Sequence, residues 1–378
     1  MTLDELFTLE KCNNAFYKLS EKTSWKESIQ RYKSNLFLNN LELIEEIING
    51  TYKISETVKF TIYERGKIRH IESAAIRDKI IQKVLCEEIL LPQLRKYLIY
   101  DNYACLKDRG TSFARKRIDV MLHKYIIQYG NDGYVIRVDI KKYFDNIDHE
   151  ILKNMLRSKL NISEDIMSLI FYFIDYPYKF NKGLKLGFEI HQILAVFYMY
   201  EVDNYVKIVL RTKLYGRYMD DIIIFSNNKD ELHKLLDEIK KQLSKLKLEI
   251  NEKKTGIFKM SKGFTFMQVK YLVIDSRIIK LPTRQKIVRI RRRLKKFREL
   301  YDLGKLSEIK IRNCYKSRIY SLMKECNRCY KSIKSLNMLY DKLFLIKERE
   351  EKKSRKKLIN EIFEEEKELY EIFSTCRQ

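Results

Sequence analysis

Two adjacent aspartates lie inside an otherwise apolar stretch, YGRYMDDIIIF (Tyr215–Phe225). The flanking residues are mostly aromatic and β-branched, the types that favour strands, so the stretch predicts a β-hairpin with Asp220 and Asp221 at its turn. A solvated turn would account for two charges there, and so would a site for divalent metal ions. The hairpin by itself leaves both interpretations open.

A second apolar run, GYVIRVDI, contains another aspartate, Asp139. The run predicts a buried strand, and a carboxylate at the end of such a strand is costly unless it is paired or binds a cation. Nucleotide polymerisation needs two divalent cations, and Mg²⁺ prefers hard oxygen ligands such as carboxylates. Asp139, Asp220 and Asp221 would together supply such ligands. Asp145 and Asp148, further along, fit a turn and a helix cap better.

Hydrophobic periodicity divides the chain into four segments and predicts an α+β fold. Residues 1–50 are predicted to be helical. Residues 51–280 alternate strands with helices, apart from an irregular aromatic stretch at 171–180. Residues 281–345 are predicted to be helical, and residues 346–378 mix Glu and Lys in one amphipathic helix suited to packing or self-association.

The chain is strongly basic. Its 378 residues include 76 Lys and Arg against 51 Asp and Glu, a formal net charge of +25. This excess favours a polyanionic partner, with nucleic acid as the first expectation and an anionic membrane surface as the alternative. No apolar run approaches the ~20 residues of a spanning helix, and the N-terminus lacks a secretory pattern. We therefore expect a soluble cytoplasmic protein that does not bind membranes.

Much of the positive charge is concentrated in RQKIVRIRRRLKKFRE (Arg284–Glu299), where nine Lys and Arg stand against one acid. Ile287, Ile290, Leu294 and Phe297 recur at helical spacing, so one face is predicted to pack and the rest to bind phosphates. The candidate nucleic-acid-binding residues are Arg284, Arg289, Arg291, Arg292, Arg293 and Lys296.

Five stretches, in order, resemble the motifs of reverse transcriptases. VDIKKYFDNIDHEIL and YGRYMDDIIIF are similar to the two metal-binding motifs, and FTIYERGKIRHIESAAIRDKIIQKVL, IYDNYACLKDRGTSFA and LEINEKKTGIF match other motifs of bacterial enzymes. The resemblance spans residues 36–344 and is greatest to the diversity-generating, retron and abortive-infection or defence-associated groups. It implies a right-hand polymerase with fingers and palm in residues 51–280 and a helical thumb in residues 281–345.

The resemblance also implies a metal centre. Asp139 and Asp220 would be the main ligands of two Mg²⁺ ions, with Mn²⁺ as an alternative. Asp221 would support them, and the Ile140 carbonyl would be a backbone ligand. Lys254 matches the lysine that protonates the departing pyrophosphate, although the neighbouring Lys253 is an alternative assignment.

Further residues match the family's nucleotide-binding positions. Phe144 corresponds to the ring that excludes a 2′-hydroxyl, with core packing as the alternative. Lys67, Arg69 and Arg77 correspond to triphosphate-binding residues, with a solvated basic face as the alternative.

Two motifs depart from the family pattern. The nucleotide-pocket motif G-x-P-x-G-N-x-x-S-Q aligns with GLKLGFEIHQ (183–192), which keeps Gly187 and Gln192 but replaces the asparagine with Phe188 and the serine with His191. The primer-contacting F-L-G-F reads FMQV, at 266–269. Since the metal-binding motifs are intact, the resemblance implies an enzyme with altered template or primer handling.

The predicted function is an RNA-directed DNA polymerase acting in bacterial antiphage defence. Its expected partners are an RNA template such as a dedicated non-coding RNA, the DNA product, dNTPs, and either a second copy of the chain or a second defence protein. A retron or diversity-generating enzyme is the alternative within the family, and a catalytically idle RNA-binding scaffold is the alternative outside it.

Overall fold

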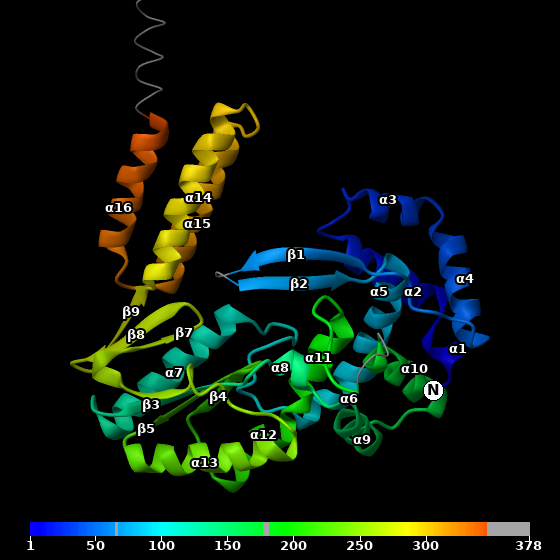
Figure 1. Ribbon diagram of the computed structural model, residues 1–378, viewed down its shortest axis with the longest axis horizontal. Coiled ribbons are helices and arrows are strands. Elements are labelled where there is room, and N and C mark those ends of the chain that lie inside the picture. The colour runs from blue at the N-terminus through cyan, green and yellow to red at the C-terminus, as the bar shows by residue number, and fades with distance from the viewer. Residues whose placement is uncertain (65–66, 177–180, 346–378) are drawn as a thin grey trace, which may run out of the picture. The chain divides into compact units, whose positions relative to one another are not determined.

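The computed structural model describes residues 1–64, 67–176 and 181–345 (Figure 1). Its contacts divide the chain into two compact units, Met1–Lys259 and Met260–Gln378, and each unit has its own hydrophobic core. Helices and strands are mixed along the chain, which confirms the predicted α+β class. In the part of the chain that is described, no helix is long and apolar enough to cross a membrane.

The first unit begins with helices and a long hairpin. The helices are α1 (Leu3–Leu6), α2 (Leu9–Ser20), α3 (Glu27–Ser34) and α4 (Leu36–Ile48). The hairpin pairs β1 (Val58–Glu64) with β2 (Lys67–Ser73) in antiparallel register. The period-two alternation of apolar residues predicts this hairpin, yet Phe60, Ile62 and Ile68 remain exposed.

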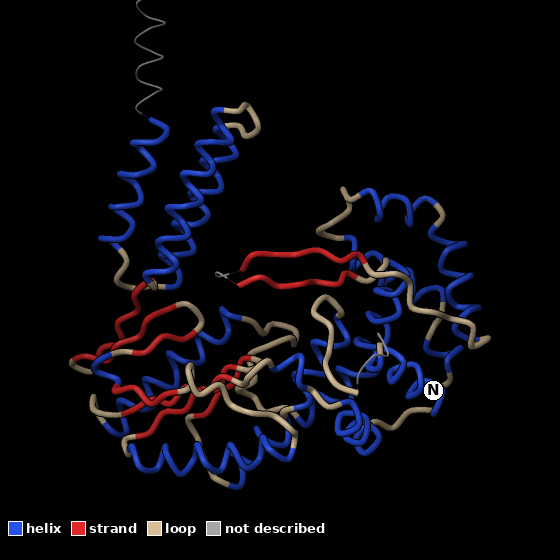
Figure 2. Tube along the Cα trace, viewed as in Figure 1, coloured by secondary structure: helices blue, strands red, loops and turns tan. Residues whose placement is uncertain are grey.

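The first unit also contains a four-stranded sheet (Figure 2). Its strands are β3 (Tyr134–Asp139), β4 (Tyr215–Tyr218), β5 (Asp221–Ser226) and β6 (Gly256–Lys259). The spatial order is β4-β5-β3-β6, and every neighbouring pair is antiparallel. This order brings β3 beside β5, although 81 residues lie between the end of β3 and the start of β5.

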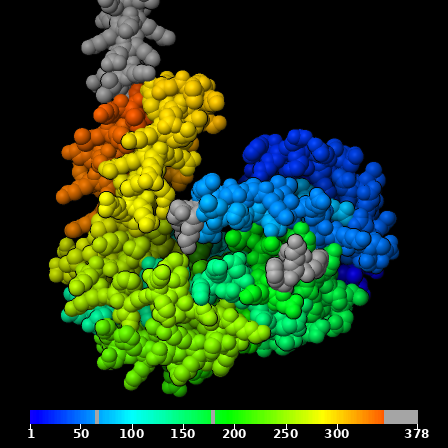
Figure 3. All heavy atoms as spheres, viewed as in Figure 1, coloured from blue at the N-terminus to red at the C-terminus, as the bar shows by residue number. Residues whose placement is uncertain are grey.

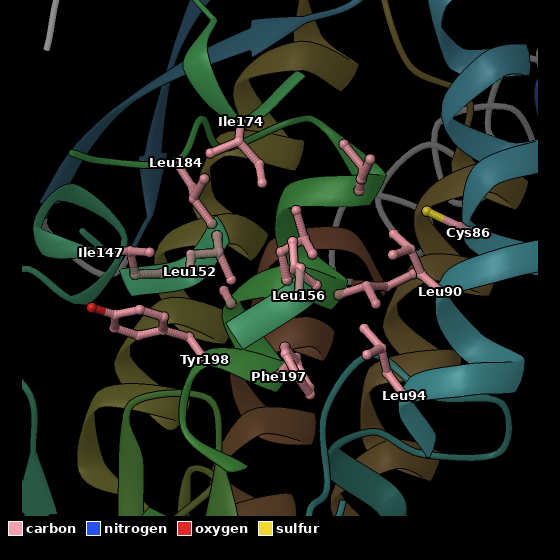
Figure 4. Close-up of a cluster of buried hydrophobic side chains, with 14 of the residues drawn as sticks. Cys86, Leu90, Leu94, Ile147, Leu152, Leu156, Ile174, Leu184, Phe197 and Tyr198 are labelled. Atoms are coloured by element: carbon pink, nitrogen blue, oxygen red, sulfur yellow. The ribbon is translucent and has the colours of Figure 1, made fainter. Parts of the chain in front are cut away.

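Helices pack against this sheet and against each other. They are α5 (Ile76–Val84), α6 (Leu91–Leu94), α7 (Thr111–Tyr129), α8 (Tyr143–Asn146), α9 (His149–Lys159), α10 (Glu164–Asp175), α11 (Glu189–Tyr198), α12 (Tyr200–Asn204) and α13 (Lys229–Lys245). Short π-helical turns at Leu85–Leu90 and Tyr205–Val209 continue α5 and α12. The core between the helices is filled by aliphatic and aromatic side chains, among them Leu90, Leu156 and Phe197 (Figure 4).

Helix α10 corrects one prediction. Residues 171–175, predicted to be irregular, belong to this helix, while residues 177–180 lie outside the described part. Ile166, Met167, Ile170, Phe173 and Ile174 are buried at helical spacing. Apolar residues also occupy much of the rest of the helix, which hides the periodicity from a reading of the sequence.

The second unit combines a small sheet with a helical bundle. The strands β7 (Phe264–Phe266), β8 (Val269–Ile274) and β9 (Arg277–Pro282) form an antiparallel meander. The helices are α14 (Arg284–Asp302), α15 (Glu308–Glu325) and α16 (Tyr330–Tyr340), followed by a π-helical turn at Asp341–Leu345. The predicted apolar face of α14 is confirmed, because Ile290 and Leu294 are buried in the bundle core. The helix predicted for residues 346–378 lies outside the described residues.

Candidate active site

The strand register brings the aspartates of the two motifs together. Asp139 is the last residue of β3, Asp221 is the first residue of β5, and the two are paired across the sheet. The Ile140 amide donates to the Asp220 carbonyl at 3.3 Å, which ties the hairpin turn to the end of β3. The backbone therefore places three carboxylate-bearing residues, and the Ile140 carbonyl, at one edge of the sheet.

The turn between β4 and β5 is tight. Met219 adopts a left-handed conformation with φ of 54°, which an L-residue adopts at some cost in energy. Burial, together with the charges of Asp221 and Asp139, raises the pKa of the Asp220 carboxyl to about 6. Burial also raises the pKa of Asp221, against the opposing effect of the Arg137 guanidinium 3.4 Å away. Both shifts follow from burying like charges near each other.

A short loop before β6 holds the Asp139 carboxylate. Lys254 Nζ lies 2.7 and 2.8 Å from its two oxygens, and Asn251 Nδ2 donates to Oδ1 at 3.0 Å. The backbone of Asp139 is also fixed, because its amide donates to Thr255 Oγ1 and its carbonyl accepts from the Asn251 amide. The sequence indicated Lys254, but Asn251 and Thr255 were missed. The sequence feature that could have indicated them is the run of polar residues NEKKT directly before a strand.

No three His, Cys, Asp or Glu side chains in the described ranges are placed to hold a metal ion together. Two of the carboxylates are instead paired with cationic side chains, Asp139 with Lys254 and Asp221 with Arg137. The donor set nevertheless fits divalent cations. It consists of hard carboxylate oxygens, and burial together with the neighbouring charges of Asp221 and Asp139 raises the pKa of Asp220. A bound cation would relieve this repulsion.

A cavity of about 860 Å³ opens beside these residues. Asp139, Ile140, Asp220 and Lys254 line one part of it. The rest of its lining comes from residues 141–143 after β3, from α13 and from the loop between α13 and β6. The cavity is large enough for a ligand of nucleotide size.

The hairpin β1–β2 contacts the segment that precedes α11 (Figure 3). The Glu72 amide donates to the Leu186 carbonyl at 3.2 Å, and Lys185 Nζ lies 2.7 Å from the Glu72 carboxylate. Gly187 has φ of 118°, and a Cβ there would lie 2.2 Å from the Glu72 carbonyl oxygen. Glycine is required because the backbones approach so closely.

Phe144 of α8 contacts the same segment. Its carbonyl accepts from the Leu184 amide at 2.8 Å, and its ring packs edge-on against Tyr143 and is partly buried against the main core. Both the sugar-contacting and the packing interpretation are compatible with this position. Asp148 caps α9, as predicted, by accepting from the Ile151 amide.

Two residues that depart from the nucleotide-pocket motif, Phe188 and His191, lie in the core. Phe188 is fully buried and stacks on His191 with ring centroids 5.0 Å apart. His191 Nδ1 accepts from the Lys185 amide at 2.9 Å, and Nε2 donates to the Phe173 carbonyl at 2.8 Å. Burial lowers the pKa of His191 to about 4, so the ring is neutral near pH 7.

The other predicted nucleotide-binding residues are more scattered. Arg77 makes an ion pair with Glu46 of α4 and lies over the Tyr52 ring. Gln192 Oε1 accepts from Cys105 Sγ at 3.6 Å. Arg69 is half-buried on β2. Lys67 begins the same strand, and its side chain lies outside the described part.

The buried ion pair of Asp203 and Arg217 was also missed. Arg217 donates to both Asp203 oxygens at 2.6–3.0 Å, and both side chains are fully buried. The same guanidinium donates to the carbonyl of Met219, directly before Asp220, at 2.9 Å, and to that of Val196 on α11. The pair thus links the aspartate turn to α11 and α12.

In the second unit, all six predicted nucleic-acid-binding residues lie on α14. Arg289 is half-buried, and the others, Arg284, Arg291, Arg292, Arg293 and Lys296, are exposed. Arg291 donates to Ser335 Oγ at 2.7 Å, and Lys296 lies 2.7 Å from the Glu299 carboxylate. The helix therefore presents a predominantly cationic surface to solvent.

Comparisons with known proteins agree with the motifs. The family model described as "Reverse transcriptase (RNA-dependent DNA polymerase)" matches residues 57–273. A search of curated protein sequences finds no match.

Among solved structures, the chain is similar to a C-terminally truncated apo telomerase from Candida tropicalis, with 16% identity over 60% of this chain and 55% of that one, and a TM-score of 0.43. It is also similar to telomerase from Candida albicans in complex with a TWJ fragment of telomeric RNA, with 12% identity over 77% of this chain and 59% of that one, and a TM-score of 0.46. The chain thus spans less than two thirds of these structures. Since the family model covers more than half of the chain, this protein belongs to the reverse transcriptase (RNA-dependent DNA polymerase) family.

Proposed function

We propose that this protein is an RNA-directed DNA polymerase that works with two divalent metal ions. The observation that carries the proposal is the meeting of Asp139, Asp220 and Asp221 at one edge of the β3–β5 pair, beside a cavity of about 860 Å³. Mg²⁺, or Mn²⁺ in its place, would be held by these carboxylates and the Ile140 carbonyl. When bound, the ions would activate the attacking 3′-hydroxyl and stabilise the charge of the leaving pyrophosphate.

Lys254 is proposed to donate a proton to the pyrophosphate. Its ammonium group contacts both oxygens of Asp139, and its side chain is 46% exposed, so it can reach a ligand in the cavity. A cation bound at Asp139 would compete with this ion pair and free the ammonium group for a phosphate oxygen. Lys253 lines the same cavity and remains the alternative donor.

The nucleotide and the nucleic acid would be held by the remaining predicted residues. Phe144 and Gly187 would shape the nucleotide pocket with Gln192, and Lys67, Arg69 and Arg77 would bind the triphosphate. Arg77 would have to exchange Glu46 for a phosphate group. The cationic surface of α14 would bind the backbone of the template and primer.

Asp220→Asn tests the metal centre. We expect primer extension on an RNA template with Mg²⁺ to fall by roughly a thousandfold or more, because the substitution removes a charge worth several kcal/mol in the transition state. Asp145→Asn, at an exposed position on α8, is the matched control and should retain activity. Normal primer extension by the Asp220→Asn variant would contradict this metal centre. Cellular function that survives the loss of primer extension would favour the idle RNA-binding scaffold.

We further propose a role in bacterial antiphage defence with an unusual template or primer. Support comes from the altered nucleotide-pocket motif, where Phe188 and His191 form a buried stack. Cells carrying the gene should plate phage less efficiently than cells carrying Asp220→Asn. Equal plating, together with a retron RNA or a variable-repeat target gene beside the gene, would instead favour the retron or diversity-generating alternative.

A further inference from the structure

The second unit contains a groove of about 370 Å³ between α14 and α15, two helices that pack side by side (Figure 1). Arg289 and Arg293 line it from α14, and Arg318 lines it from α15. Gln268, in the tight turn between β7 and β8, also lines the groove and accepts from Arg289 at 3.3 Å. The groove is thus built from three elements of one unit.

The charged side chains that line the groove are all positive. Its lining contains no carboxylate among the described residues. The nearby Glu325 is already paired with Lys286 and accepts from Ser321 Oγ at 2.7 Å. Arg318, in contrast, has no ion pair or hydrogen bond with any described residue. Three guanidinium groups around a small space attract an anion that offers several acceptor oxygens.

The floor of the groove is apolar. Ile290 and Leu294 form its base, and the rings of Tyr315 and Phe297 lie beside them. A groove of about 370 Å³ is at the small end of the usual ligand range. A nucleic-acid duplex cannot enter it, whereas one nucleoside with its phosphate can.

We propose that this groove binds a nucleoside 5′-phosphate, either as a free mononucleotide or as the phosphorylated 5′ end of a strand. A terminal phosphate carries up to two charges and presents three oxygens, which suits three arginines better than an internal phosphodiester with one charge. The apolar floor would accept the base. The proposal concerns binding at a site distinct from the carboxylates, and it stands whether or not the protein polymerises DNA.

The test compares two single-stranded oligonucleotides that differ only in a 5′-phosphate or a 5′-hydroxyl. Anisotropy titrations without dNTPs or metal ions should give roughly tenfold tighter binding of the phosphorylated strand. Arg318→Gln should bring the affinity ratio close to one. Lys316→Gln, which removes an exposed charge of the same helix outside the groove, should preserve the ratio. Equal affinities in the unchanged protein, or an equal loss in both variants, would overturn the proposal.

A second measurement uses Cys314, an exposed thiol in the lining of the groove. Alkylation followed by peptide mass analysis should show that the 5′-phosphorylated strand protects Cys314 more strongly than the 5′-hydroxyl strand does. Competition by AMP would identify a free mononucleotide as a ligand, and protection by the strand alone would identify a strand end. If neither AMP nor the phosphorylated strand protects Cys314, the site is contradicted. Asp220→Asn should leave all these results unchanged, which separates this proposal from the polymerase.

Discussion

At the scale of single residues, His191 makes buried hydrogen bonds that the sequence could not reveal. Its ring accepts from one backbone amide and donates to one backbone carbonyl, and Phe188 covers its face. The ring must be neutral to accept at Nδ1. The substitution in the nucleotide-pocket motif is therefore accompanied by a complete set of hydrogen bonds inside the core.

This arrangement makes stability depend on pH. Because burial lowers the pKa of His191 from 6.5 to about 4, the unfolded chain takes up a proton first as the pH falls. The contribution of His191 to the free energy of unfolding is therefore fully present above pH 6.5 and is lost as the pH falls through 4. His191→Gln should remove this dependence, so the stability difference between the two proteins should shrink by up to about 3 kcal/mol between pH 7 and pH 4.

Chemical denaturation at several pH values measures the effect. His123→Gln, at an exposed histidine, is the control and should follow the unchanged protein at every pH. A stability difference between the His191 variant and the unchanged protein that is constant with pH would show that the ring does not titrate as inferred.

Phe144 offers a test of sugar selection. If its ring excludes the 2′-hydroxyl, Phe144→Ala should raise ribonucleotide incorporation relative to deoxynucleotides by on the order of tenfold to a hundredfold. Single-nucleotide extension with each sugar measures the ratio. Tyr143→Phe keeps the neighbouring ring and removes only its bond to the Ala195 carbonyl, so it should leave the ratio unchanged. An unaltered ratio in Phe144→Ala would favour the packing interpretation.

At the scale of elements, the hairpin β4–β5 depends on a bond network beneath it. Arg217 joins the turn carbonyl of Met219 to Asp203 of α12 and to α11. Tyr215 of the same hairpin also donates to Asp203, at 2.5 Å. The network fixes the position of Asp220 relative to the helices that support the sheet.

Removing one partner of this pair should be costly. Asp203→Asn leaves a buried guanidinium without its counter-charge, and we expect a loss of about 3–5 kcal/mol in the free energy of unfolding. Urea denaturation measures it. The double change Arg217→Met with Asp203→Leu leaves no unpaired charge. It should therefore lower the free energy of unfolding by less than the sum of the losses from Arg217→Met alone and Asp203→Leu alone. Additive losses would mean that the two side chains do not act as a pair.

At the scale of the whole molecule, the net charge of +25 predicts binding that weakens with salt. Each phosphate neutralised by the protein contributes about 0.7–0.9 to the slope of log affinity against log salt concentration. Replacing Arg284, Arg291 and Arg292 with Gln should lower that slope by about two to three. Replacing Lys22, Arg31 and Lys33 in the N-terminal segment should change the slope less. A larger change from these three replacements than from those on α14 would mean that the nucleic acid does not bind mainly at α14.

Much of this molecule could be predicted from local pattern. The runs around Asp139 and Asp220 are apolar and strand-forming, and the amphipathic repeat of α14 is regular, so each element follows from its own residues. Helix α10 was missed because its apolar residues are nearly continuous. Asn251, Thr255 and the Asp203–Arg217 pair were missed because ordinary polar residues acquire their importance only from neighbours distant in sequence.

The sequence by itself therefore determined the family, most of the order of helices and strands, and the residue types that can bind metal ions and phosphates, because these depend on composition and short spacing. Only the tertiary structure decided which groups meet. Sheet order set Asp139 beside Asp221, and a loop more than a hundred residues downstream of Asp139 brought Lys254 to its carboxylate. The packing of α14 on α15 left three arginines around one groove. Such contacts depend on where distant segments are brought together in space, and local sequence does not encode that.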